Sequence, residues 1–335
     1  MSSQIVAQLG ALKTRYFPHG IAPQWITIEQ QTVTLRLPFL LSQQGLHEVI
    51  EAAGLSGWQW QLAPQIERLR NSQPELPMRT GNVIVVSSGK GGVGKSSVTV
   101  SLAIALQQLG ARVGIIDADI YGPSIPTMLG RASDSLQFTS RNKMIPQQVH
   151  DLQVNSLGYL VADKDATIWR GPMASAALQQ LFKDTDWPQL DYLLVDMPPG
   201  TGDIQLTMAQ KLPVTGALVV TTPQTVALAD AQKGIAMFNK LDIPLLGVLE
   251  NMSVYQCPSC GHQEAIFGDS GGAQVAAEQG VPLLGQWPLF APLRESLDQG
   301  VPYNRQHADS AIAAQMRDSA AFLTANLYYQ RHDRV

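Results

Sequence analysis

The sequence predicts an α/β fold built on a mostly parallel, doubly wound sheet, preceded by a small α+β N-terminal domain. Short apolar, β-branched runs alternate with helical patterns from residue 82 onward, as in successive βα units. Two of these runs, Val113–Ile116 and Leu190–Val195, end directly in aspartate. Residues 1–70 follow the different order α-β-β-α-β. Helices that alternate with buried strands cover both faces of a parallel sheet, so this pattern favours the doubly wound arrangement.

Composition excludes several classes of function. The chain has 335 residues, of which 45% are hydrophobic and 15% are charged, with a formal net charge of −4. Nonspecific nucleic-acid binding needs a basic surface, and no apolar run approaches the roughly 20 residues that span a bilayer. No signal-peptide pattern is present at the start. We therefore expect a cytoplasmic protein with neither a nucleic-acid nor a membrane partner.

Domain boundaries follow from local patterns. Residues 1–70 form the predicted accessory domain, which resembles the small domain of MIP18 type but lacks its cysteine and its Asp-Pro-Glu motif, so no site is assigned to it. Residues 71–81 carry two prolines and are the predicted linker. Residues 82–335 form the main domain, in which residues 131–165 show little periodicity beyond a short strand near Leu152–Leu157. The predicted elements are helices at Gln4–Arg15, Leu46–Ala53, Val226–Leu241, Gly272–Glu278 and Ser310–Leu327, and strands at Trp25–Glu29, Thr32–Leu37, Trp58–Leu62, Ala217–Thr221, Leu245–Glu250 and Pro282–Gly285.

A glycine-rich loop follows the first strand of the main domain. Val83–Val86 is a β-branched run, and a helical pattern begins near Ser96. The loop fits G-x-x-x-x-G-K-[ST], in which backbone N–H groups cradle polyphosphate, lysine meets the β- and γ-oxygens and serine ligates Mg²⁺. A glycine-rich turn that binds nothing is the alternative, but strand and helix lie where the motif requires them. The expected nucleotide-binding residues are Gly89, Lys90, Gly91, Gly92, Val93, Gly94, Lys95, Ser96 and Ser97.

Lys90 is an additional lysine within this loop. It adds little to the cradle that Lys95 already supplies, and it is better placed to reach across an interface. Gly-Lys-Gly-Gly-Val-Gly-Lys-Ser resembles the deviant phosphate loop of the ATPases that include nitrogenase iron protein, the Min and Par positioning ATPases, the arsenite pump ATPase and the Mrp/ApbC cluster carriers. In that group the extra lysine reaches the partner's nucleotide, so the resemblance implies a homodimer closed by ATP. An exposed, solvated lysine is the alternative.

Three aspartates follow predicted strands. Asp196 ends an apolar strand, as in a Walker B motif, and its carboxylate is expected to hold Mg²⁺ together with Ser96. Asp117 and Asp119 lie at the carboxyl end of another strand, where open parallel sheets bind ligands. The resemblance implies that Asp119 activates water and that Asp117 couples the switch to nucleotide. Helix capping is the alternative for both.

The sequence Asp-Met-Pro-Pro-Gly-Thr-Gly-Asp at residues 196–203 is closer to the Mrp/ApbC pattern than to that of the positioning ATPases. The resemblance covers about residues 76–305. It implies that Asn251 recognises adenine, although a turn-forming role is also plausible, and that the turn at Trp287–Leu289 closes over the base. Asp203 is expected to cap a helix, and Trp169 is expected to serve in packing.

Cys257 and Cys260 are the only two cysteines of the chain, and they form a C-x-x-C pair. This spacing suits a metal centre better than a thioredoxin-like redox pair, since it follows a late strand instead of opening an early helix. A four-thiolate site then needs a second chain, which suits a shared [4Fe–4S] cluster on a two-fold axis. Zinc in the same site, and His262 as a further ligand, remain chemical alternatives.

These motifs together predict a slow ATPase that uses ATP and Mg²⁺ and carries a [4Fe–4S] cluster at a homodimer interface. Its expected partners are iron–sulfur scaffold donors and recipient apoproteins. One alternative is a Min/Par-like positioning switch without metal chemistry. Another is an ATPase whose dimer is held together by zinc at Cys257 and Cys260.

Overall fold

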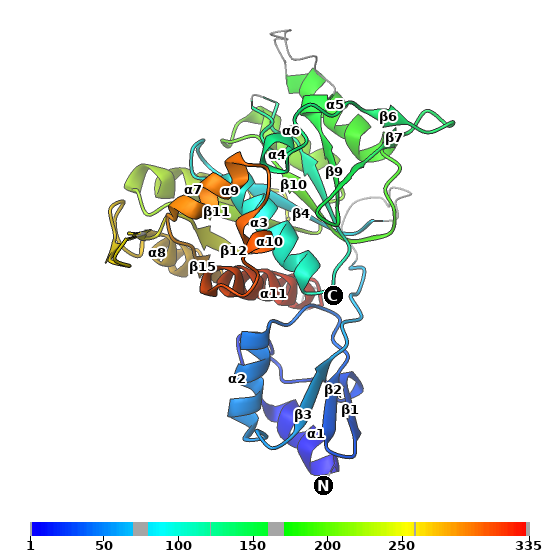
Figure 1. Ribbon diagram of the computed structural model, residues 1–335, viewed down its shortest axis with the longest axis vertical. Helices are drawn as coiled ribbons and strands as arrows, with labels where there is room; N and C mark the ends of the chain where they lie inside the picture. The colour runs from blue at the N-terminus through cyan, green and yellow to red at the C-terminus, as the bar shows by residue number, and fades with distance from the viewer. Residues whose placement is uncertain (1, 70–79, 121, 160–170, 258, 333–335) are drawn as a thin grey trace.

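A computed structural model of the chain describes residues 2–69, 80–120, 122–159, 171–257 and 259–332. Its main feature is an eight-stranded sheet flanked by helices (Figure 1). Every neighbouring pair in this sheet is parallel except the edge pair β8–β9, which is antiparallel. The predicted doubly wound α/β fold is therefore confirmed. The strand order is β15 (Leu283–Gln286), β12 (Leu245–Glu250), β11 (Gly216–Thr221), β4 (Thr80–Ser87), β10 (Leu190–Asp196), β5 (Val113–Asp117), β9 (Leu152–Ser156) and β8 (Gln147–Val149).

Both faces of the sheet are buried, and strand β4 shows how. Val83 and Val85 belong to one hydrophobic core, whereas Ile84 and Val86 belong to the other, as the two-residue period of a strand requires. Burying each such side chain contributes about 1.5–3 kcal/mol. The Ile84 face packs on α3 (Lys95–Gln108) and α11 (Ala311–His332), and the Val83 face packs on α5 (Gly171–Asp184), α6 (Asp203–Lys211), α7 (Thr225–Lys240) and α8 (Gly271–Glu278).

The first 62 residues form a second, three-stranded sheet. Strands β1 (Ile26–Glu29) and β2 (Thr32–Leu35) are antiparallel, and β3 (Gln59–Leu62) pairs parallel with β2. Two helices, α1 (Ser2–Ala11) and α2 (Gln43–Ala53), complete the predicted α-β-β-α-β order. Helix α2 starts earlier than predicted because the Ser42 hydroxyl accepts a hydrogen bond from the Gly45 N–H and caps it. It ends at Gly54, whose left-handed φ of 60° suits glycine.

This N-terminal module does not have a core of its own. Its buried side chains, among them Phe17 and Phe39, form one continuous cluster with those of α3 and α11. Figure 1 shows the module lying against α11. Helix α1 ends at Ala11, short of the predicted Arg15, because Arg15 and Tyr16 turn toward Asp318 of α11. Tertiary contacts thus join the predicted accessory domain to the main domain.

Further elements differ from the prediction or extend it. Strand β4 begins at Thr80, inside the predicted linker, because Thr80 pairs with Leu190 of β10; the rest of that linker lies outside the described residues. A hairpin of β6 (Gln137–Phe138) and β7 (Met144–Ile145) occupies part of the region predicted to be irregular. The short remaining elements are α4 (Ile125–Met128), β13 (Tyr255–Gln256), β14 (Gln263–Glu264), α9 (Ala291–Asp298) and α10 (Tyr303–Gln306).

Of two predictions about single residues, one is wrong and the other is not tested. Asp203 is the first residue of α6 and not its cap, because Gly202 occupies the N-cap position. The segment that contains Trp169 lies outside the described residues. Among the residues that the structure describes, no helix is both long enough and apolar enough to cross a membrane.

Candidate nucleotide and metal sites

The phosphate loop joins β4 to α3 at the carboxyl edge of the large sheet. Gly92 and Gly94 have φ angles of +84° and +81°, a conformation that side chains other than glycine rarely adopt. Gly94 is the N-cap of α3 and offers no side chain to the helix N-terminus. The backbone N–H groups at this end therefore remain for an anionic ligand, and the helix dipole favours one.

A cavity of about 180 Å³ opens in front of this loop. Seven of the nine predicted loop residues line it, all but Gly89 and Val93, together with Asp119, which lies two residues after β5. The rest of its lining is Ser88, Ser124, Met128 and Pro199. The last of these lies in the glycine-rich segment after β10, which is tied to the loop because the Gly200 N–H donates to the Ser88 carbonyl at 2.9 Å.

Asp196 is the centre of the polar network beneath the loop. It is fully buried, and its Oδ2 lies 2.7 Å from Lys95 Nζ and accepts a 2.6 Å hydrogen bond from the Ser96 hydroxyl. Its Oδ1 accepts a 2.7 Å hydrogen bond from the Thr99 hydroxyl. The Ser96 hydroxyl and the Asp196 carboxylate are adjacent hard oxygen ligands, the kind that Mg²⁺ prefers. The residues present therefore fit a magnesium ion.

Thr99 is a site residue that the sequence reasoning missed. It lies four residues after Lys95, on the same face of α3, and this spacing was the available signal. The Thr99 side chain is fully buried between the helix and Asp196. Because each Asp196 oxygen has a hydroxyl donor, the carboxylate is fixed in orientation before any ligand arrives.

Asp117 lies opposite Asp196 in the pairing of β5 with β10. Burial, together with the neighbouring negative charge of Asp196, raises the pKa of Asp117 to about 8, and Lys95 partly opposes this shift. The Asp117 carboxylate accepts hydrogen bonds of 3.2 Å from the Ile125 N–H and from the Ser156 hydroxyl. It therefore connects β5, α4 and the end of β9.

Asp119 and Lys90 lie at the open side of the cavity. Asp119 is partly buried, and its Oδ2 lies 3.9 Å from Lys95 Nζ. Asp119 thus lies beside Lys95 in the lining of the cavity. Lys90 is exposed, in contrast to the buried Lys95. The structure thus places one lysine in the network and leaves the other at the surface.

Asn251 follows β12 directly and contacts the phosphate loop from the side. Its amide donates a 2.9 Å hydrogen bond to the Val93 carbonyl. Trp287 is buried, and its indole N–H donates to the Ser319 hydroxyl of α11 at 3.1 Å. The Trp287 indole therefore packs in the core. The turn at Trp287–Leu289, which the resemblance implies to close over the base, does lie beside Asn251.

Cys257 and Cys260 lie at the turn of the β13–β14 hairpin. The Cys257 N–H donates to the His262 carbonyl, and the Gly261 N–H donates to the Cys257 carbonyl, both at 2.9 Å. Hydrogen bonds from the backbone N–H groups of Cys260 and Ser259 lower the pKa of the Cys257 thiol. A turn that directs N–H groups at sulfur stabilises the thiolate, which is the form that binds metal.

Within the described ranges, no group of three or more His, Cys, Asp and Glu side chains could hold a metal ion. His262 therefore does not complete a three-ligand site with the cysteines in this chain. Cys257 is partly buried and Cys260 is exposed. One chain thus presents two thiols at its surface.

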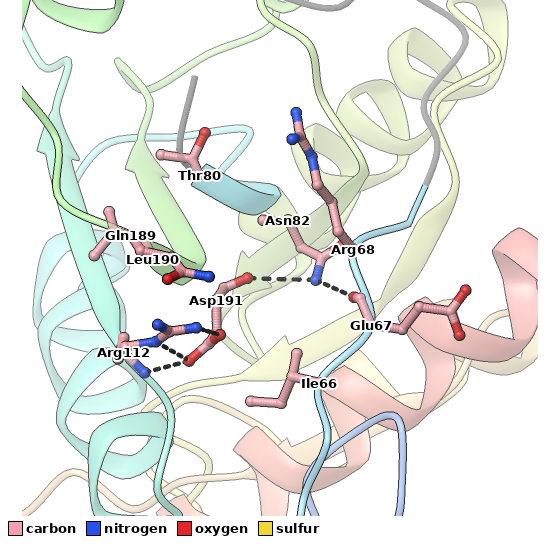
Figure 2. A pocket seen from close by; sticks show the side chains of 10 residues that line it. Ile66, Glu67, Arg68, Thr80, Asn82, Arg112, Gln189, Leu190 and Asp191 are labelled. Carbon is pink, nitrogen blue, oxygen red and sulfur yellow. Dashed lines mark hydrogen bonds and ion pairs between the residues drawn. The ribbon is translucent and has the colours of Figure 1, made fainter. Parts of the chain in front are cut away.

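A larger cavity, of about 480 Å³, lies at the opposite edge of the sheet (Figure 2). Several of its polar groups bind one another: the Arg112 guanidinium donates to Asp191 at 2.6 and 3.1 Å, and the Asn82 amide donates to the carbonyls of Glu67 and Asp191. None of the predicted site residues lines it. We therefore place the candidate site at the phosphate loop, where the reactive groups gather.

Two curated proteins with sequences similar to this chain are named for iron–sulfur cluster carriage or transfer. The iron-sulfur cluster carrier protein of Escherichia coli K12 is 50% identical over 307 residues, which cover 89% of this chain and 83% of the relative. The iron-sulfur cluster transfer protein NUBPL of Dictyostelium discoideum is 45% identical over 238 residues, covering 71% and 74%.

Solved structures support the same fold. The nucleotide-binding protein of Archaeoglobus fulgidus in complex with ADP has a TM-score of 0.59 and 33% identity, over 66% of this chain and 87% of that one. The cell division ATPase MinD of Pyrococcus furiosus has a TM-score of 0.53 at 22% identity, over 76% and 99%, which shows the fold alone. Residues 79–324 match the family described as ParA, the NUBPL iron-transfer P-loop NTPases, and the chain belongs to this family.

Proposed function

We propose that this protein is an ATP-hydrolysing iron–sulfur cluster carrier that holds a [4Fe–4S] cluster between two copies of the chain and transfers it to apoproteins. The observation that carries the proposal is the C-x-x-C hairpin, which presents two surface thiols with N–H groups directed at one of them. Cys257 lies six residues after Asn251, which contacts the phosphate loop. The names of relatives at about 50% identity support the same proposal.

The nucleotide half of the proposal assigns a role to each residue of the network. Lys95 and the loop N–H groups bind the phosphates of ATP, while Ser96 and Asp196 hold Mg²⁺, which would neutralise developing phosphate charge. Asp119 orients the attacking water, and Asp117 couples the switch segment to the nucleotide. Lys90 reaches the nucleotide of the partner chain. We expect slow hydrolysis to ADP and phosphate, because Lys90 acts only in the dimer.

The cluster half of the proposal rests on ligand number. Two thiolates per chain give four across a two-fold axis, which is the set that a [4Fe–4S] cluster needs. The exposure of Cys260 suits a cargo that must be loaded by a scaffold donor and released to a recipient. In this proposal the two thiolates act only as cluster ligands and form no disulfide with each other.

Metal and sulfide analysis of protein reconstituted without oxygen tests this proposal. A shared four-iron cluster predicts about two iron and two sulfide per chain, lost together in Cys257→Ser and in Cys260→Ser. Glu264→Ala, which changes an exposed residue of β14 in the same hairpin, is the matched control and is expected to retain both elements. Zinc without sulfide would instead show that the cysteines only hold the dimer together. Wild-type iron in both cysteine variants would refute the assignment.

The positioning-switch alternative makes a different prediction. It requires nucleotide-dependent binding to DNA or to lipid vesicles and no bound metal. The net charge of −4 disfavours a DNA-binding surface. Cosedimentation with DNA or with vesicles in ATP, but not in ADP, would favour this alternative.

A further inference from the structure

The loop that carries the two cysteines is held at both of its ends by the carboxyl end of β12. At its start, the Asn251 amide donates to Val93 of the phosphate loop at 2.9 Å. At its end, the fully buried Glu250 carboxylate accepts a hydrogen bond from the Gly272 N–H, at the first turn of α8. Glu250, the last residue of β12, and Asn251, which follows it, thus hold the far end of the cysteine loop and the phosphate loop respectively.

The contact between Asn251 and the phosphate loop is closely packed. Val93 is 4% exposed and Asn251 is 6% exposed. The Asn251 amide lies against Gly94: a Cβ added to this glycine would lie only 2.3 Å from Asn251 Nδ2. The Asn251 side chain therefore has no space to move toward the loop. A displacement of the Val93–Gly94 peptide therefore has to displace Asn251 or break its hydrogen bond.

The segment from Asn251 to the hairpin is also held along its length. The Ser253 N–H donates to the Trp287 carbonyl at 2.9 Å, and the Leu289 N–H donates to the Val254 carbonyl at 2.7 Å. Tyr255, the first residue of β13, continues this parallel pairing with Leu289. A shift at Asn251 is therefore passed along a paired strand to Cys257 and is not absorbed by a free loop.

We propose that Asn251 is a positioning residue that transmits the nucleotide state of the phosphate loop to the cysteine hairpin within one chain. Phosphates bind to the N–H groups of the loop, and the Val93 carbonyl belongs to the same short, glycine-flanked turn. Nucleotide binding then changes the position of this carbonyl, and Asn251 carries the change to β13. The inference rests on the proposed function, since it requires nucleotide at the phosphate loop.

Hydrogen exchange of the metal-free protein tests the transmission directly. Saturating MgADP is expected to slow exchange in the phosphate loop, residues 88–97, and in the hairpin, residues 253–264. In Asn251→Ala, with MgADP raised until the phosphate loop is fully protected so that any loss of nucleotide affinity is compensated, the hairpin is expected to lose its response. Hairpin protection that persists in Asn251→Ala, while the loop is protected, overturns the inference.

Asn304→Ala is the matched control. The Asn304 amide is buried and donates at 2.8 Å to the Ser101 carbonyl of α3, the helix that follows the phosphate loop. This variant loses an equivalent buried hydrogen bond and is expected to keep the hairpin response. If Asn304→Ala also loses it, general destabilisation explains the effect and the inference fails.

A second measurement uses the loaded protein. In the wild type, MgATP is expected to change the rate at which an iron chelator removes the cluster by at least about fivefold, within the usual range of coupling between sites. In Asn251→Ala this ratio falls to about one at the same cluster content. An unchanged ratio overturns the inference. A wild type whose loop does not respond to nucleotide refutes the proposed function as well, whereas a protected loop beside an unresponsive hairpin refutes the inference alone.

Discussion

At the scale of single residues, Asp196 depends on hydroxyl groups that a motif search does not report. The carboxylate is buried beside Asp117, so its negative charge needs every donor around it. Lys95 and Ser96 belong to the motif, but the third donor, Thr99, does not. The phosphate site is therefore built on one residue more than its signature contains.

Replacing Thr99 with valine tests this role. The variant keeps the shape of the side chain but leaves Asp196 Oδ1 without its hydroxyl donor, which is expected to cost about 1–3 kcal/mol of unfolding free energy. We also expect slower ATP hydrolysis, because Asp196 is less firmly oriented. Denaturant unfolding and phosphate release measure the two effects. Thr99→Ser restores the donor and should recover both, and equal losses in the serine and valine variants would exclude the hydrogen bond as the cause.

At the scale of elements, α11 joins the N-terminal module to the nucleotide-binding sheet. Asp318 of this helix accepts hydrogen bonds from the hydroxyls of Tyr16 and Ser42, at 2.5 and 2.8 Å, and pairs with Arg15 at 2.9 Å. Burial and the Asp318 carboxylate together raise the pKa of the Tyr16 hydroxyl far above its usual value. The hydroxyl therefore remains a donor, and the network acts as the polar centre of an otherwise apolar contact.

Replacing Asp318 with alanine tests how much this network stabilises the contact between the N-terminal module and α11. Two buried hydroxyl donors lose their acceptor, so we expect the free energy of unfolding to fall by about 2–3 kcal/mol. Limited proteolysis should also cut sooner within residues 12–42. The matched control is Asp298→Ala, whose ion pair with Arg294 is exposed on both sides and should change stability by less than about 1 kcal/mol. Equal free energies of unfolding for the two variants would show that the contact between the N-terminal module and α11 does not depend on Asp318.

At the scale of the whole molecule, the proposed chemistry is divided between buried and exposed groups. Lys95 and Asp196 lie beneath the phosphate loop, whereas Lys90 and Cys260 are exposed. The exposed groups are the ones that the proposed function assigns to a second chain. In the proposed function, the fold of one chain prepares the nucleotide site, and a second chain completes the assembly.

The variant Lys90→Ala distinguishes nucleotide binding by one chain from the steps that the proposal assigns to a second chain. We expect the variant to bind nucleotide in one chain, because Lys95 remains, and to lose most of its hydrolysis. A cation supplied from a partner to a phosphoryl transfer typically contributes about 10³-fold or more in kcat. Equilibrium nucleotide binding, phosphate release and sedimentation in ATP measure the three properties. The control is Lys240→Ala, an exposed lysine far along α7. Wild-type hydrolysis and ATP-dependent dimerisation in Lys90→Ala would exclude a role at the interface.

The sequence by itself determined the sheet and the phosphate loop, because both depend on local patterns. Strands β5, β10, β11 and β12 lie within one residue of their predictions, since a β-branched run buried on both faces has few alternatives. The loop residues are equally local, because glycines and a following helix impose the geometry. The pair of cysteines was also found from spacing alone.

Only the tertiary structure decided which distant side chains meet. Thr99 and Asp196 are 97 residues apart, and Asn251 and Val93 are 158 apart, so no local pattern links them. The shared core of the N-terminal module and α11 likewise arises from contacts between the two ends of the chain, such as Tyr16 with Asp318. Local propensity fixes the elements, but the burial of their apolar faces selects the long-range pairs, and that selection follows from packing of the whole chain.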